Sequence, residues 1–285
     1  MTLPPPAPDR TCIVTGASSG IGREIGRRLA ERGLGVTLVA RRDDRLRELA
    51  AELTAAHAVR AEVVAADLTD PEARLGIVRQ VAERGLTADV LVNNAGLSTV
   101  GPVHRSDPER ELAMIRTNVE AVADLCARVL PGMVERGRGA ILNVASTAAF
   151  QPMPAQAGYA ASKAFVLAYS EAVRAELSGT GVTVTALCPG PVETEFADRA
   201  GFGTGEASAA LPRFMWVSAE SVARQAVEGL DRGRGVVVPG AANKVGALGA
   251  RLAPRSLLVP LIARQHPGLR NPADRAERAG RADRA

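Results

Sequence analysis

One tyrosine and one lysine stand four residues apart in the segment YAASK, at Tyr159 and Lys163, thirteen residues after Ser146. Positions four apart on a helix share one face, so the phenol and the ammonium can lie side by side. A phenol has an unperturbed pKa of about 10, and a neighbouring cation favours its phenolate form. The pair is therefore suited to moving a proton at a carbonyl or hydroxyl oxygen, which the Ser146 hydroxyl could hold.

Lysine is rare in this chain, which makes its use at this position informative. The only two lysines are Lys163 and Lys244, although Lys and Arg together number 35. We infer that arginine would not serve at position 163. A tyrosine and a lysine at this spacing also recur by chance, and Ser146 could instead cap a turn.

A glycine-rich turn, TGASSGIG at residues 15–22, follows an apolar run and opens a helical pattern. Glycines let the backbone approach a phosphate, and a helix amino end adds partial positive charge. The G-x-x-x-G-x-G spacing differs from the G-x-G-x-x-G dinucleotide fingerprint, and glycines serve turns in general. We interpret the turn as a pyrophosphate cradle. Its predicted cofactor contacts are Gly16, Ser18, Ser19, Gly20, Ile21 and Gly22.

Charged residues at the ends of the next two predicted strands indicate which dinucleotide would bind. Arg41 and Arg42 stand where NAD-binding domains usually carry an acidic residue, and an arginine there can pair with a 2′-phosphate. We therefore predict NADP(H) in preference to NAD(H), with Arg41 the stronger candidate; the alternative, which weighs more for Arg42, is that both arginines simply solvate a helix start. Asp67, followed by Leu68, could accept from the adenine amino group, whereas Asp70 before a proline is typical of a helix N-cap.

Apolar runs alternate with amphipathic stretches along most of the chain. Helical stretches such as 23–33 and 42–56 separate the runs, and near-continuous apolar runs are typical of strands covered on both faces. The pattern predicts a single α/β domain, a Rossmann-type doubly wound parallel sheet of about seven strands that binds ligands at the strands' carboxyl ends. The runs lie at 11–16, 35–40, 61–67, 88–94, 139–146, 181–190 and 235–240.

Six motifs in this order resemble the short-chain dehydrogenase/reductase family, over roughly residues 10 to 240. They are TGASSGIG at 15–22, NNAG at 93–96, Asn118 in IRTNVEA, Ser146, YAASK at 159–163 and PGPVET at 189–194. The resemblance implies that Tyr159 is the general acid in reduction and the base in oxidation. It also implies that Lys163 lowers the Tyr159 pKa and binds the nicotinamide ribose, and that Ser146 holds the substrate oxygen.

The same resemblance assigns the remaining candidate residues. Asn118 would anchor a water in a proton relay from Lys163, the alternative being a helical asparagine turned to solvent. Asn93 and Gly96 would lie along the cofactor and stabilise the central strand. Further predicted cofactor contacts are Asn94, Ala95, Tyr159, Lys163, Pro189, Gly190, Val192 and Thr194. The predicted function is NADP(H)-dependent interconversion of a ketone and a secondary alcohol; the alternative is a catalytically silent NADP-binding sensor or scaffold.

The sequence predicts three segments outside this domain and one within it that differ in character. Residues 1–9 are expected to form a flexible, proline-rich lead-in, and residues 267–285 a disordered tail. Between them, 190–216 is expected to be a substrate lid or a long surface excursion. Residues 241–266 form a C-terminal extension whose arginines lie among leucines. We favour packing of this extension against its own domain or a partner subunit over contact with a membrane surface, because Pro254 and Pro260 would break a long helix.

Composition alone selects no class of partner. A pI of about 9.4 comes without a basic stripe or interleaved aromatics, so we do not expect nucleic-acid binding. Three cysteines in apolar contexts, Cys12, Cys126 and Cys188, predict buried free thiols and a cytoplasmic protein. The three histidines show no metal-ligand spacing, so no metal is expected. The resemblance implies a homodimer or homotetramer acting on a small carbonyl or alcohol.

Overall fold

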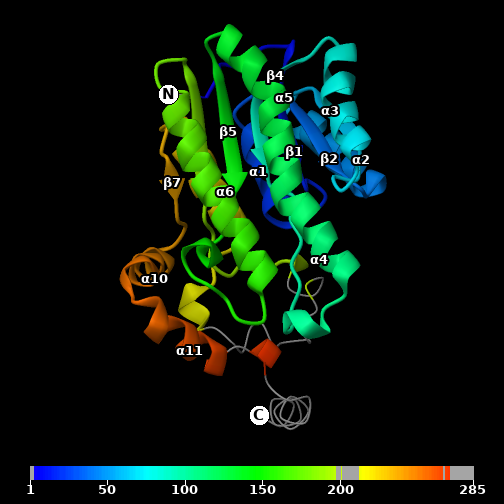
Figure 1. The fold of residues 1–285 in the computed structure, drawn as a ribbon. Helices are drawn as coiled ribbons and strands as arrows, with labels where there is room; N and C mark the ends of the chain where they lie inside the picture. The colour runs from blue at the N-terminus through cyan, green and yellow to red at the C-terminus, as the bar shows by residue number, and fades with distance from the viewer. Residues whose placement is uncertain (1–2, 197–199, 201–211, 266, 270–285) are drawn as a thin grey trace.

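The computed structural model describes residues 3–196, 200, 212–265 and 267–269, and a parallel sheet runs through them (Figure 1). Within this part of the chain seven strands lie in the order β3-β2-β1-β4-β5-β6-β7. The strands are β1 (Arg10–Thr15), β2 (Val36–Ala40), β3 (Ala61–Ala65), β4 (Thr87–Asn93), β5 (Gly139–Val144), β6 (Val182–Leu187) and β7 (Val236–Val237). The predicted doubly wound α/β fold is confirmed.

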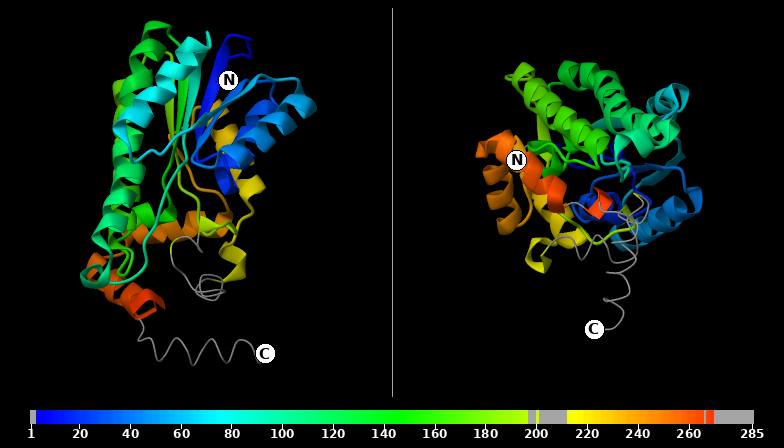
Figure 2. Two further views of the ribbon diagram at one scale, coloured as in Figure 1. Left: turned by 90° about the vertical axis from the view of Figure 1, so that its right-hand side faces the viewer. Right: turned by 60° about the horizontal axis from the view of Figure 1, so that its bottom comes forward.

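Helices cover both faces of the sheet (Figure 2). One buried core unites α1, α2 and α9 with the sheet, and a second unites α3, α5 and α6 with its other face. The α-helices are α1 (Gly20–Ala30), α2 (Asp43–His57), α3 (Pro71–Glu83), α4 (Pro108–Ile115), α5 (Ala121–Glu135), α6 (Ala157–Glu176), α9 (Ala219–Asp231), α10 (Ala241–Leu252) and α11 (Arg255–Gln265). Shorter helical turns are η1 (Val103–Arg105), the π-helical η2 (Arg116–Glu120), η3 (Thr147–Phe150), η4 (Arg213–Met215) and η5 (Pro267–Leu269).

The apolar runs form strands because both of their faces are buried. All six residues of β5 are buried, and so are the first four of β2. The three cysteines are buried free thiols, as predicted, and burial raises the pKa of Cys126 to about 12. Asp70 caps α3 by accepting from the Glu72 backbone N–H at 2.9 Å, with Pro71 in the first turn, which confirms the predicted N-cap.

The order of the strands sets the position of a ligand crevice. β1 pairs with β2 on one side and with β4 on the other, so the chain reverses its direction of travel across the sheet between these neighbours. Open α/β sheets bind ligands at such a switch point, outside the carboxyl ends of the strands. The glycine-rich turn after β1 and the NNAG segment after β4 both lie at this edge.

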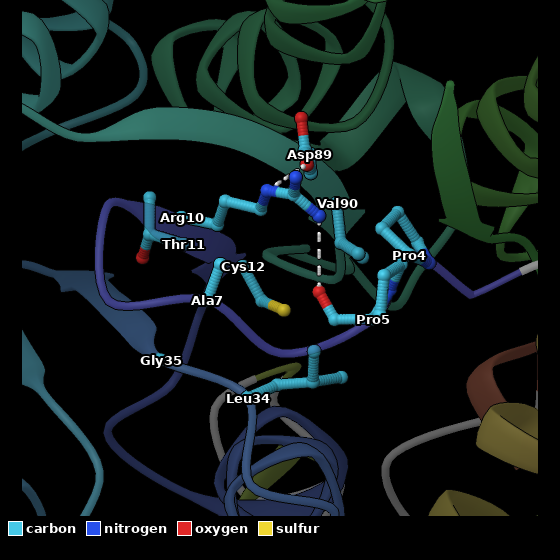
Figure 3. A pocket seen from close by; sticks show the side chains of 10 residues that line it. All are labelled: Pro4, Pro5, Ala7, Arg10, Thr11, Cys12, Leu34, Gly35, Asp89 and Val90. Carbon is cyan, nitrogen blue, oxygen red and sulfur yellow. Dashed lines mark hydrogen bonds and ion pairs between the residues drawn. The ribbon is translucent and has the colours of Figure 1, made fainter.

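The expected lead-in lies against the opposite, amino end of the sheet. Pro4 is buried, and Arg10 donates to the Pro5 carbonyl at 3.2 Å (Figure 3). Three arginines surround the buried carboxylate of Asp89, with Nε–Oδ distances of 3.4 Å to Arg10, 3.5 Å to Arg136 and 3.0 Å to Arg138. Residues 3–10 therefore contact the domain, and this charged cluster lies at the far end of β1 and β4 from the crevice.

The C-terminal extension forms α10 and α11, separated at Pro254. The expectation that Pro260 would also break the helix is wrong, because Pro260 lies inside α11. Its ring removes a bond to the carbonyl four residues earlier, at Ser256. Both residues are exposed, so water can pair with that carbonyl and the helix continues.

Parts of all four expected segments fall outside the described residues. These are 1–2 of the expected lead-in, 197–199 and 201–211 of the expected lid, 266 of the expected extension and 270–285 of the expected tail. In the part of the chain that the structure does describe, no helix combines the length and the apolar character needed to cross a membrane.

Candidate active site

The glycine-rich turn is held against the end of β4 by Thr15. The Thr15 hydroxyl donates to the Val92 carbonyl at 3.1 Å and accepts from the backbone N–H groups of Asn94 at 2.9 Å and Ala95 at 3.1 Å. In return the Asn94 amide donates to the Thr15 carbonyl at 2.9 Å. Thr15 was not among the predicted site residues, because only the folded chain shows that its hydroxyl faces β4.

The glycines of the turn are required by close packing and by backbone conformation. A Cβ at Gly22 would lie 2.3 Å from the Asn94 Nδ2 and 2.5 Å from the Gly16 carbonyl oxygen. Gly16 has a φ of 66° and Gly20 a φ of 55°, in the left-handed region that favours glycine. Backbone N–H groups at the start of α1 have no side-chain cap and no acidic residue in the first turn, which leaves this helix end suited to an anion.

Arg42 is built into the turn, whereas Arg41 is not. The Arg42 guanidinium donates to the hydroxyls of Ser18 and Ser19, both at 2.9 Å, and pairs with Glu195 at 3.0 Å. Arg42 therefore does more than solvate the start of α2. The Arg41 side chain is 61% exposed, and it lies 4.0 Å from the Asp67 carboxylate.

Glu195 joins the segment after β6 to these arginines. Besides its contact with Arg42, its carboxylate accepts from Arg45 at 2.7 Å. A ligand phosphate that reached Arg42 would compete with this carboxylate for the guanidinium. Glu195 was not predicted, since nothing in its local sequence places it beside α2.

Asp67 and Leu68 line the end of β3. The Asp67 carboxylate accepts from the Thr69 backbone N–H at 3.0 Å and from its hydroxyl at 2.9 Å, while remaining 47% exposed. Leu68 is buried, and its carbonyl accepts from the buried Arg74 at 2.8 Å. These contacts hold the β3 loop at the carboxyl edge of the sheet, near Arg41.

Ser146 and Tyr159 come together from β5 and α6. Ser146 follows the end of β5 by two residues and caps η3, where its hydroxyl accepts from the Ala148 backbone N–H at 3.1 Å. Burial raises the pKa of the Tyr159 phenol, and a hydrogen bond with Ser146 opposes that rise. The Tyr159 ring also packs against Phe196, with ring centroids 5.8 Å apart. The two hydroxyls therefore share one site at the crevice.

Lys163 is buried one turn further along α6. Its ammonium donates to the Val144 carbonyl at 2.8 Å and lies 5.9 Å from the centroid of the Tyr159 ring. Burial lowers the pKa of Lys163 to about 8. The structure thus confirms that the phenol and the ammonium occupy one helix face, and it leaves the charge of Lys163 sensitive to mildly alkaline pH.

Asn118 lies in the π-helical turn η2 between α4 and α5, and its side chain is fully buried. The Asn118 amide accepts from the Leu97 backbone N–H at 2.8 Å and donates to the Leu97 carbonyl at 2.9 Å and the Ser162 hydroxyl at 3.0 Å. The alternative that this asparagine turns to solvent is wrong. A single π-turn inside a helix is frequent at functional sites. Ser162, unpredicted, ties this turn to α6.

Gly96 lies between the two buried polar groups. A Cβ at this position would lie 3.4 Å from both the Asn118 Oδ1 and the Lys163 Nζ. Asn93, by contrast, is buried in the sheet, where its amide donates to Asn143 at 2.9 Å. Asn93 therefore stabilises the central strands, as expected, and its side chain is buried against α5, where its amide also donates to the Cys126 sulfur at 3.3 Å.

The segment after β6 closes the other side of the crevice. The Pro189 carbonyl accepts from the Thr147 N–H at 2.9 Å, and a Cβ at Gly20 would lie 3.1 Å from the Thr194 Cγ2. Val192 packs against the core that contains α1. A Cβ at Gly190 would lie 2.3 Å from the Asn243 Oδ1, so α10 packs directly on this segment.

Asn243 anchors the extension to the crevice and was missed by sequence reasoning. It is 1% exposed, and its amide nitrogen donates to the carbonyls of Met215 at 3.0 Å and Pro239 at 3.1 Å. The one available signal was an asparagine in a helix otherwise built mainly of alanine, glycine and leucine. That signal does not reveal which carbonyls it meets.

The residues present fit a dinucleotide that carries an additional phosphate. The glycine-rich turn and the uncapped start of α1 suit a pyrophosphate. Arg41 and Arg42 suit a further anionic group, and the exposed Asp67 carboxylate offers a hydrogen-bond acceptor. Over the described residues no cluster of side chains suited to a metal ion is present. Fold and site together define a nucleotide-binding α/β protein with a phenol and a buried ammonium at its crevice.

Comparison with known proteins agrees with this class. A sequence profile of the family described as short chain dehydrogenase matches residues 10–201. A short chain dehydrogenase of Pseudocercospora fijiensis is 41% identical over 188 residues, which cover 65% of this chain and 60% of that protein. A short-chain dehydrogenase from Sphingobium yanoikuyae, solved in complex with NADPH, superposes with a TM-score of 0.75 at 35% identity, covering 87% of this chain and 95% of that one.

A second solved structure is a variant of actinorhodin polyketide ketoreductase with NADPH. It superposes with a TM-score of 0.72 at 34% identity, covering 84% of this chain and 97% of that one. The chain therefore belongs to the short-chain dehydrogenase/reductase family, a class of oxidoreductases that act on CH–OH groups.

Proposed function

We propose that this protein uses NADP(H) to interconvert a ketone and a secondary alcohol, with Tyr159 as the proton donor and acceptor. When bound, the nicotinamide supplies or accepts the hydride. The observation that carries the proposal is the convergence of Ser146, Tyr159 and Lys163 at the crevice next to the glycine-rich turn. The family resemblance and the two NADPH complexes support it.

The chain's own residues would hold the cofactor along the carboxyl edge of the sheet. Gly16, Gly20, Gly22 and the first N–H groups of α1 would face the pyrophosphate, with Ser18, Ser19 and Ile21 completing that turn. Arg42 and Arg41 would meet a 2′-phosphate, and Asp67 and Leu68 the adenine. The nicotinamide half would run past Asn94, Ala95 and Gly96 and the segment containing Pro189, Gly190, Val192 and Thr194.

The remaining groups would control the proton. Ser146 would hold the substrate oxygen beside the Tyr159 hydroxyl, so the phenol can protonate the alkoxide formed in reduction. The Lys163 ammonium would stabilise the resulting phenolate and hydrogen-bond the nicotinamide ribose. Asn118, buried on the far side of Gly96, would anchor a water that passes a proton from Lys163 to solvent.

The substrate is proposed to be a small carbonyl compound, and the protein a homodimer or homotetramer. Large apolar side chains support self-association, since Leu112 and Ile115 on α4 and Phe165 on α6 are 47%, 37% and 38% exposed. Sedimentation of the purified protein would measure the number of subunits.

The direct experiment is a turnover assay with NADPH and NADH over ketones of several sizes, following absorbance of the reduced nicotinamide. The proposal expects consumption of NADPH with at least one ketone and formation of the matching alcohol. Tight NADPH binding without turnover on any carbonyl would instead favour a cofactor-binding protein without catalysis.

Arg42→Ala is expected to raise the KM for NADPH by about 10- to 100-fold and to change the KM for NADH much less. The reason is the loss of a charge-assisted contact to the 2′-phosphate, which NADH lacks. Steady-state kinetics with both cofactors measure the difference. Arg47→Ala, one turn further along α2 and paired with Asp43, is the matched control. Arg41→Ala tests the neighbouring arginine in the same way. If both variants changed the KM for NADH as much as the KM for NADPH, the basis for the NADP preference would be removed.

The rate of ketone reduction is expected to fall above a pH of about 8. The Lys163 pKa is lowered to about 8, so the ammonium that supports Tyr159 is lost as the pH rises through that value. Because kcat/KM for NADPH reports groups of the free enzyme, its pH profile is the measurement. A profile that stays flat to a pH of about 10 would contradict this role of Lys163.

Unfolding does not explain the expected fall in reduction rate, because the shifted pKa of Lys163 makes the free energy of unfolding rise with pH. The folded-state pKa of Lys163 lies below the ordinary value of 10.5, so between these values the unfolded chain binds the extra proton. The contribution of Lys163 to the free energy of unfolding therefore rises with pH across this window. Thermal unfolding measured at the same pH values separates the two effects.

A further inference from the structure

The C-terminal extension carries positive charge without any compensating acid. No aspartate or glutamate occurs between Asp231 and Asp274. Within the described part of this stretch, α10 and α11 carry Lys244, Arg251, Arg255 and Arg264, all exposed. The neighbouring segment 212–218 also lacks acidic residues. This end of the chain is therefore suited to a negatively charged partner.

One face of α10 is buried against the domain, and the other is exposed. Asn243 and Ala247 face inward and are buried, at 1% and 6% exposure. Val245, Leu248 and Leu252 follow the i, i+3, i+7 spacing of a single helix face and are 73%, 59% and 75% exposed. The expected packing against the domain is thus made by the small side chains, and within the described part of the chain the large aliphatic side chains stay exposed.

α11 repeats this arrangement after the break at Pro254. Leu257 and Leu261 are 70% and 53% exposed, one turn apart on one face, and Arg264 continues that face. Leu258 and Ile262, each one position further along the helix, are partly buried. Five large aliphatic side chains, Val245, Leu248, Leu252, Leu257 and Leu261, thus protrude from two consecutive helices. We call them the aliphatic face.

The two helices lie at the end of the molecule toward which the strands point, the end that holds the crevice (Figures 1 and 2). α10 contacts η3, which directly follows Ser146, and η4, where Phe214 is 75% exposed. The Arg251 guanidinium lies 5.8 Å from the Phe150 ring of η3. A partner that covered α10 would therefore stand next to the active-site end.

We propose that the aliphatic face and its cations dock this protein on the surface of an anionic lipid bilayer. Leucine and valine would enter the boundary between headgroups and acyl chains while Lys244, Arg251, Arg255 and Arg264 meet lipid phosphates. Helices that bind at this boundary combine such a face with arginine and lysine.

The composition of the aliphatic face argues against a second copy of this chain and against another protein as its partner. A second copy bound through the same patch on both subunits would bring these cations toward one another with no acid to pair them. Protein interfaces are enriched in aromatic residues, methionine and arginine. The helices α10 and α11 carry arginine but no aromatic residue and no methionine.

Co-sedimentation of the full chain with vesicles tests this proposal without depending on its enzymatic activity. One set of vesicles contains phosphatidylcholine alone, and the other contains equal amounts of phosphatidylcholine and phosphatidylglycerol. Binding is expected to the second set, and to weaken as salt is added. Trp216, the only tryptophan, follows η4, so its fluorescence should shift to shorter wavelength on binding.

Two variants separate the apolar and the ionic contributions. Leu248→Glu with Leu257→Glu is expected to lower the partition onto anionic vesicles by about tenfold or more, because two exposed leucines that would enter the bilayer are replaced by anions. Arg251→Gln with Arg255→Gln is expected to lower it several-fold. Val134→Glu, a single change of the same kind at a 39% exposed site on α5, is the control and should bind as the natural chain does.

The proposal is overturned if the natural chain binds neither set of vesicles at low salt, or if the leucine variant binds as well as Val134→Glu. It is also overturned if light scattering shows that the leucine variant dissociates a dimer while the natural chain does not bind lipid. In that case the aliphatic face joins two copies of this chain.

Discussion

Replacing Tyr159 by phenylalanine is expected to lower kcat for ketone reduction by about 100- to 10,000-fold while leaving the Kd for NADPH unchanged. The substitution removes only the hydroxyl, so the ring contact with Phe196 and the packing of α6 persist. What is lost is the proton that the phenol would deliver to the alkoxide. Stopped-flow turnover and fluorescence titration with NADPH measure the two quantities separately.

The chain provides a matched control for this substitution in its only other tyrosine. Tyr169 lies on the same helix and stacks on Phe165 at 5.5 Å, and burial raises its pKa to about 12. Tyr169→Phe should therefore retain its activity. If Tyr159→Phe were as active as Tyr169→Phe, Tyr159 would not be the acid.

Replacing Lys163 by methionine is expected to weaken two properties together. Methionine retains much of the chain's volume but removes the donor to the Val144 carbonyl and the charge near Tyr159. Loss of the ribose contact should raise the Kd for NADPH by about tenfold, and loss of the cation should lower kcat by about 100-fold or more. The fall above pH 8 expected for the natural chain should also vanish from the residual activity.

The second lysine serves as the control here. Lys244→Met changes an exposed residue of α10 and should leave cofactor affinity, kcat and the pH profile as they are. A purely structural role for Lys163 would lower thermal stability and expression without altering the pH dependence. An unchanged fall in activity above pH 8 in Lys163→Met would therefore assign that pKa to another group.

Features that depend on local pattern could be predicted from the sequence. The seven strands follow from apolar runs bounded by turn residues, and the cap at Asp70 from its place before Pro71. The shared face of Tyr159 and Lys163 follows from helical spacing alone. In each case the determining residues lie within a few positions of one another, so no long-range contact was needed.

Features that depend on contacts between distant segments could not be predicted from the sequence. Thr15 accepts a hydrogen bond from Asn94, which follows the neighbouring strand β4, and Asn243 contacts the segment after β6. Arg42 reaches Ser18 and Glu195 from elements far apart in the chain. The continuation of α11 through Pro260 depends on exposure, which the composition of the segment does not reveal.

The most direct test of the proposed chemistry follows the hydride itself. The protein is incubated with a panel of ketones and with NADPH in which both hydrogens at C4 of the nicotinamide are deuterium. Any alcohol formed is examined by mass spectrometry and NMR. We expect one deuterium at the carbinol carbon of the product, and no such product from Tyr159→Phe on the same time scale. An alcohol without deuterium at that carbon, or the same labelled product formed equally fast by Tyr159→Phe, would contradict the account.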